Sequence, residues 1–137
     1  MSTPNVKAVL RFAAALSTNS DTTEAIAEVC REATADLDAR PNLAMVFVSH
    51  HHGPDFEPVA AGICQRTHTE NLLGCTGEAI VSGHLELEGR PALALWLAHL
   101  PDVTIRTAHL EFEQTAEGAT FLGWPDDLSD EWPAGSA

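Results

Sequence analysis

The sequence predicts an α/β domain on a mixed β-sheet, with helices packed on the sheet. Apolar residues recur at helical spacing over 22–39, and an uninterrupted apolar strand follows over 43–48. The same helix and strand pattern repeats up to residue 75, so a β-α-β-α-β start with right-handed crossovers is expected. Alternating segments over 79–113 then predict an antiparallel meander.

The first helix is predicted from Thr22 to about Ala39. Asp21, followed three residues later by Glu24, has the spacing of a capping box. Its buried face, at i, i+3, i+4 and i+7 spacing, comprises Ile26, Val29, Cys30, Ala33 and Leu37. Cys30 is therefore expected in the core.

The second helix is predicted after Asp55, which we expect to cap it. Pro58 is tolerated in its first turn, where backbone N–H groups have no partner within the helix. Its buried face comprises Phe56, Val59, Ala60, Ile63 and Cys64. The earlier segment 7–16 (KAVLRFAAAL) fits a helix or a buried strand equally well by periodicity.

The meander is expected to contain three strands. Residues 79–88 alternate as one half-exposed strand, with Val81, Leu85 and Leu87 on one face. Segment 92–98 is apolar on both faces. Segment 103–113 alternates with a register change near Thr107-Ala108 that indicates a β-bulge.

Residues 1–113 are assigned to the domain. Residues 114–137 are assigned to an acidic tail that contains proline or to a link to a second half.

Composition excludes several classes of partner. The 137 residues include 7 Lys and Arg against 20 Asp and Glu, a formal net charge of -13. This charge repels nucleic-acid phosphates and anionic membranes, so neither is expected as a partner. No apolar run approaches the about 20 residues of a membrane helix, and no secretory signal is evident. Three widely spaced cysteines fit a reducing compartment, so a cytoplasmic location is expected.

The candidate site is centred on Gly74, Cys75, Thr76, Gly77 and Glu78. Glycine lets a ligand or another backbone approach closely, so we expect a binding turn at a strand end. The alternative is a tight turn that needs its glycines only for its own shape. In the binding alternative, N–H groups freed at Thr76 and Gly77 suit a carboxylate, and Glu78 suits an ammonium group. An amino acid is therefore the preferred ligand.

Ser49 and the three histidines His50 to His52 follow the first apolar strand. Loops at the carboxyl ends of parallel strands gather ligands, so Ser49, His50 and His51 are expected to border the same site. Consecutive side chains on an extended segment point to opposite faces, and no cysteine or carboxylate at ligand spacing accompanies them. No metal is therefore predicted, and no cofactor.

Catalysis is not expected. No Ser/His/Asp order, phosphate-binding loop or dinucleotide glycine pattern occurs. As a nucleophile, Cys75 would need a base that the sequence does not place beside it. A ligand sensor is the first reading, an interaction scaffold without a ligand is the alternative, and a cysteine-dependent enzyme is the third.

The sequence resembles the amino-terminal half of the FIST domain family (F-box and intracellular signal-transduction proteins) over about 10–112. The resemblance rests on the helix start 21–25 (DTTEA), the strand 43–48 and above all segment 72–78 (LLGCTGE). It implies that segment 7–16 is a strand and that the chain belongs to a sensory module for small ligands, with amino acids proposed. It names no catalytic residue.

A second half follows in that family, so contact with a carboxy-terminal FIST half is an expected partnership. Trp124 in an otherwise polar tail also favours association, and a homo-oligomer is the alternative to the second half.

Overall fold

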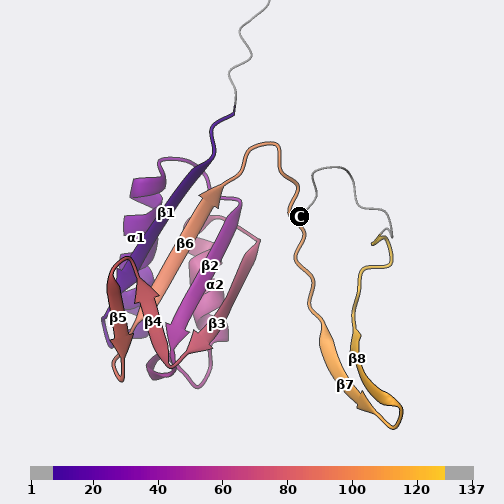
Figure 1. Ribbon diagram of the computed structural model, residues 1–137. Helices are drawn as coiled ribbons and strands as arrows, with labels where there is room; N and C mark the ends of the chain where they lie inside the picture. Colours follow the sequence, from indigo (N-terminus) through magenta and orange to yellow (C-terminus); the bar gives the residue numbers. More distant parts are fainter. Residues whose placement is uncertain (1–7, 129–137) are drawn as a thin grey trace, which may run out of the picture. The chain divides into compact units, whose positions relative to one another are not determined.

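The computed structural model describes residues 8–128 (Figure 1). These residues fall into two compact units that divide between Ile105 and Arg106. In chain order the elements are β1 (Arg11–Ser17), α1 (Thr22–Leu37), β2 (Leu43–Ser49), η1 (His50–His52), α2 (Glu57–Thr67), β3 (Leu72–Gly77), β4 (Ala79–Ser82), β5 (Leu85–Glu88), β6 (Leu93–His99), β7 (Glu111–Thr115) and β8 (Gly118–Leu122).

The first unit is built on a four-stranded mixed sheet in the order β1-β6-β2-β3. β6 is antiparallel to both of its neighbours, and β2 is parallel to β3. Strands β1, β2 and β3 therefore run in one direction, with β6 inserted between the first two (Figure 1). The α/β class with a mixed sheet is confirmed, and the ambiguous first segment is a strand from Arg11 onward. Lys7 lies outside the described residues.

Both helices cover the same face of the sheet (Figure 1). The carboxylate of Asp21 caps α1 by accepting the N–H of Glu24 at 2.9 Å, as its sequence spacing predicts. The cap of α2 differs, because Phe56 and not Asp55 is the capping position; Asp55 still accepts the N–H of Glu57 at 3.1 Å. No helix among residues 8–128 is long and apolar enough to cross a membrane.

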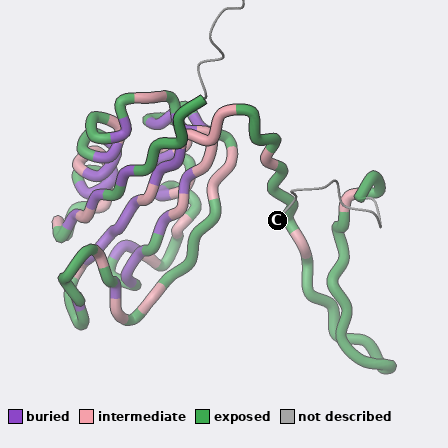
Figure 2. The backbone as a smooth tube through the Cα atoms, turned by 45° about the horizontal axis from the view of Figure 1, so that its top comes forward, coloured by how far each residue is buried: buried purple, intermediate pink, exposed green. Residues whose placement is uncertain are grey.

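The core lies between the two helices and this face of the sheet, where buried residues gather (Figure 2). It joins strand and helix residues that include Val46, Val48, Leu93, Leu95, Leu97, Ala25, Val29, Cys30 and Ile63. The predicted buried stripe of α1 is thus confirmed. In α2 the prediction holds for Val59 and Ile63, whereas Phe56, Ala60 and Cys64 are only half-buried. The opposite face of the sheet is not covered by helices: Phe12 is 53% exposed and stacks on Trp96 at 5.6 Å between ring centroids.

Residues 79–88 form the β4–β5 hairpin and not the single strand that was predicted. Gly83, with φ of 60°, occupies the turn, and glycine adopts this conformation without steric cost. The reversal changes which residues face inward. Ile80 and Leu87 pair across the hairpin and are buried, whereas Val81 is 64% exposed.

The predicted meander is also wrong. Residues 103–110 form no strand, and 111–113 belong to β7, which pairs with β8 in the second unit. The physical reason is that β6 already has β1 on one side and β2 on the other, so it offers the following segment no free edge. Within the second unit, Phe112 and Phe121 contact edge to face at 5.5 Å between centroids.

Candidate functional site

The two segments singled out in the sequence lie side by side. In the parallel β2–β3 pair, Ser49 is opposite Gly77 and Val48 is opposite Thr76. The loop after Ser49 and the exposed Glu78 therefore both follow the carboxyl ends of these strands, as predicted for parallel strands.

Gly74 to Gly77 are strand residues, so the predicted turn is wrong. A Cβ at position 74 would lie 2.5 Å from the carbonyl oxygen of Val46 and 2.5 Å from its Cγ1. The close approach that glycine permits here is thus made by the neighbouring strand. A structural requirement explains Gly74 without any ligand.

β3 is the last strand of its sheet, so half of its backbone groups have no strand partner there. The N–H of Ala44 donates to the carbonyl of Asn71 at 2.9 Å, which sets the phase of the ladder. In a regular parallel ladder this phase directs the N–H groups of the odd-numbered residues of β3 toward β2. Of the two N–H groups predicted to be free, that of Thr76 lies at the edge, whereas that of Gly77 belongs to the ladder.

A groove of about 240 Å³ runs between β3 and α2, and we call it the β3–α2 groove. It is lined by Val46, Val48, Phe56, Val59, Ala60, Leu72, Gly74, Cys75 and Thr76. Because side chains alternate along a strand, Thr76 faces this groove together with Val48. The side chain of Cys75 lies on the opposite face, across from Phe47. The groove is mainly apolar, and the backbone groups on the outer edge of β3 lie at its border.

Cys75 is the most exposed of the three cysteines, as predicted, whereas Cys64 is less buried than its predicted place on the helix face implies. Cys75 is exposed, Cys64 is half-buried and Cys30 is buried. Burial raises the pKa of Cys30 to about 11 and also raises the pKa of Cys64. Among the described residues, no hydrogen bond joins the Cys75 thiol to a histidine or a carboxylate.

Ser49 is part of the fold's internal hydrogen bonding. Its hydroxyl accepts the N–H of Ala92 at 3.0 Å, and its own N–H donates to the Ala92 carbonyl at 2.9 Å. These two hydrogen bonds hold the end of β2 next to the start of β6. His51, whose Nδ1 lies 3.2 Å from the Ser49 hydroxyl, is exposed and stacks on His50 at 4.0 Å between centroids. Of the three predicted site residues Ser49, His50 and His51, the two histidines are exposed and Ser49 is buried.

His52 is the buried member of the triplet, with an exposed fraction of 4%. Its Nδ1 lies 3.0 Å from the hydroxyl of Thr22, and its Nε2 is buried with no partner among the described residues. Burial lowers the pKa of His52, and the neighbouring His51 lowers it further. The sequence did not predict that His52 is buried, because nothing in it indicates which of three consecutive histidines turns inward. No group of three potential metal ligands occurs within residues 8–128.

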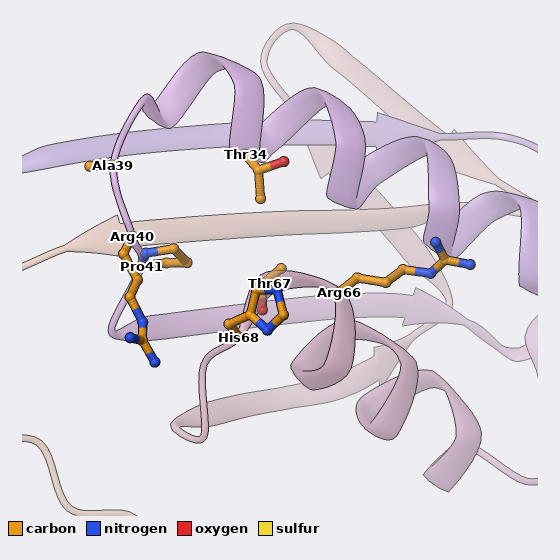
Figure 3. A pocket seen from close by; sticks show the side chains of 7 residues that line it. All are labelled: Thr34, Ala39, Arg40, Pro41, Arg66, Thr67 and His68. Carbon is orange, nitrogen blue, oxygen red and sulfur yellow. The ribbon is translucent and has the colours of Figure 1, made fainter.

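A larger cavity, of about 520 Å³, lies at the other end of the helices (Figure 3). It is lined by Thr34, Ala39, Arg40, Pro41, Arg66, Thr67 and His68. Figure 3 shows the side chains of Arg40 and Arg66 extending in different directions. The hydroxyls of Thr34 and Thr67 donate to helix carbonyls. The polar groups of this cavity do not converge on one point, so the β3–α2 groove remains the better candidate.

The family described as FIST N domain matches residues 42–129 of the chain. Uncharacterized protein Rv0628c of Mycobacterium tuberculosis (strain ATCC 25618 / H37Rv) is 34% identical over 119 residues, which cover 86% of this chain. Uncharacterized protein Mb0898c of Mycobacterium bovis (strain ATCC BAA-935 / AF2122/97) is 30% identical over 119 residues, again 86% of this chain. The chain spans about 30% of the length of these relatives.

Proposed function

Because the chain belongs to the FIST N domain family, we propose that it is a ligand-sensing domain for signal transduction and that it binds an amino acid or a related metabolite. The observation that carries this proposal is the β3–α2 groove, which opens beside the joined ends of β2 and β3. Sensing, and not catalysis, is proposed.

The groove favours a small ligand with an apolar part. Pockets for drug-sized molecules measure about 300–1,000 Å³, and this groove is smaller, at about 240 Å³. Val59, Ala60 and Leu72 provide an apolar wall. At the rim of the groove, the edge N–H of Thr76 suits a carboxylate, and the carboxylate of Glu78, which follows β3 and is not part of the groove lining, suits an ammonium group. An amino acid with an aliphatic side chain combines these three features.

A thermal-shift screen over the amino acids tests the proposal. Leucine, isoleucine or valine is expected to raise the melting temperature, because a ligand that binds only the folded state stabilises it. Ala60→Leu should abolish the shift by filling the groove. Ala61→Leu is the matched control, since Ala61 is exposed on the same helix and does not line the groove. No shift with any amino acid, or an unchanged shift in the Ala60 variant, would contradict the proposal.

A cytoplasmic location is part of the proposal. The chain is acidic, and its three cysteines are free, which suits a reducing compartment. Fractionation of cells that express the native protein checks this, and recovery outside the cytoplasm would contradict it.

The alternative function is an interaction scaffold. It is supported by the sheet face opposite the helices, which the β4–β5 hairpin covers only in part and which carries the exposed Phe12, Phe47 and Leu73. A flat ligand screen combined with concentration-dependent self-association would favour the scaffold.

A further inference from the structure

The outer edge of β3 lacks the features that normally protect a strand edge. Natural edge strands carry charges, proline or bulges that prevent another strand from pairing with them. β3 reads Leu-Leu-Gly-Cys-Thr-Gly, with no charge and no proline, and its pairing with β2 is continuous from Leu72 to Gly77. Its central residues, 73–76, are exposed. In the four-stranded sheet of the described residues no strand pairs with this edge, so it can accept an additional strand.

The backbone groups at this edge are placed for strand addition. The N–H groups and carbonyls of Gly74 and Thr76 alternate with those that bond to β2, so they point outward at the spacing of a β-ladder. An extended peptide can bond to them, and its own alternate side chains then face the helix side of the sheet. One of those side chains meets the apolar β3–α2 groove.

Charge at both ends of β3 selects the kind of peptide. The exposed residues Glu70 and Glu78 flank the uncharged strand, in a chain of net charge -13. In an antiparallel pairing of two copies through β3, Glu70 of one copy would approach Glu78 of the other, which is repulsive. Lys or Arg at both ends of an added segment would instead pair with these glutamates.

We propose that the free edge of β3 binds an extended peptide segment of another protein by strand addition, with an apolar side chain in the β3–α2 groove and basic residues at its ends. This proposal does not depend on the identity of a small ligand. It also gives a ligand-sensing domain a means of output, because the small ligand and the peptide side chain would occupy the same groove.

The test uses a fluorescein-labelled peptide about as long as β3, with alternating leucine and threonine between terminal lysines, and fluorescence anisotropy as the readout. Thr76→Pro is the informative variant, because proline removes an outward N–H without removing a bond to β2. We expect it to fold and to bind the peptide about tenfold more weakly, the effect of one lost hydrogen bond of ordinary strength. Ala61→Leu, at an exposed position of α2 that does not line the groove, should bind like the parent.

A second measurement does not depend on the folding of a variant. The peptide is N-methylated on alternate amides: methyl groups on the amides that face β3 should abolish binding, and methyl groups on the other amides should leave it unchanged. Replacing the terminal lysines by glutamates should weaken binding. Equal binding by both methylated peptides would overturn strand addition. Self-association through β3 without peptide binding would overturn the choice of a basic peptide over a second copy.

Discussion

The hydroxyl of Thr22, at the start of α1, lies 3.0 Å from Nδ1 of His52, the last residue of the short helical turn after β2. This contact joins two segments that are 30 residues apart in sequence. The other ring nitrogen of His52 is buried without a partner among the described residues. A protonated ring would place a positive charge in this buried position, so the folded protein favours the neutral form.

His52 should therefore make stability depend on pH. Its pKa in the folded protein is lowered from the ordinary value of 6.5, so the unfolded chain takes up the proton first as the pH falls. Its contribution should be fully present above pH 6.5 and should decline as the pH falls through the folded-state pKa. Urea unfolding above and below pH 6.5 measures this. His52→Gln should reduce the dependence, whereas His50→Gln, at an exposed ring, should not; equal slopes in parent and His52→Gln would contradict the assignment.

Thiol reactivity should follow burial. We expect Cys75 to be labelled first by iodoacetamide, because it is exposed, whereas burial raises the pKa of both Cys30 and Cys64 and leaves less thiolate. Mass spectrometry of the native protein after short exposure identifies the labelled site. Modification of Cys30 before Cys75 would show that the α1 face is assigned wrongly.

Two glycine substitutions should have opposite effects. Gly74→Ala forces a Cβ against the Val46 carbonyl oxygen at 2.5 Å and should cost about 1–3 kcal/mol of folding stability. Gly62→Ala, inside α2, meets only Ile26 methyl groups at 3.4 Å and should add about 0.5–1 kcal/mol, because alanine favours a helix. Denaturant unfolding of both variants measures the difference, and a stabilised Gly74→Ala protein would refute the close approach of β3 to β2.

The cap of α1 gives a third stability prediction. Asp21→Ala removes the acceptor for the N–H of Glu24 and should destabilise the protein by about 1 kcal/mol. Asp21→Asn keeps a capping oxygen and should lose much less. Melting temperatures measured side by side distinguish the two, and similar losses in both would mean that charge, and not the hydrogen bond, is responsible.

Competition follows if both proposals hold. Leucine at a concentration that saturates the thermal shift should lower the affinity for the basic peptide, because both place an apolar group in the β3–α2 groove. Anisotropy titrations with and without leucine measure this. Ala61→Leu should show the same competition as the parent, and additive binding of the two would place them at separate sites.

Helix α1 and strand β2 could be predicted because their apolar spacing is local and uninterrupted. The neighbouring positions of Ser49 and Gly77 also followed from the expected parallel strands, and are confirmed. Gly74 was wrongly predicted to lie in a ligand-binding turn. A glycine indicates that something approaches the backbone closely, but the sequence does not show what approaches, and here it is strand β2. The β4–β5 hairpin was missed because Gly83 reverses the chain within an alternating segment, and alternation continues on both sides of the turn.

The position of β6 means that the sheet can be completed only after β6 has been synthesised. β6 is the last of the four sheet strands to leave the ribosome, yet it lies between β1 and β2. Until it arrives, the nascent chain holds β1 on one side and the β2–β3 pair on the other, and nothing joins them within the sheet. Contacts this distant in sequence form slowly. A nascent chain released before Leu93 would leave unpaired the edges of β1 and β2 that β6 later joins, and these two edges are what a folding chaperone would need to protect.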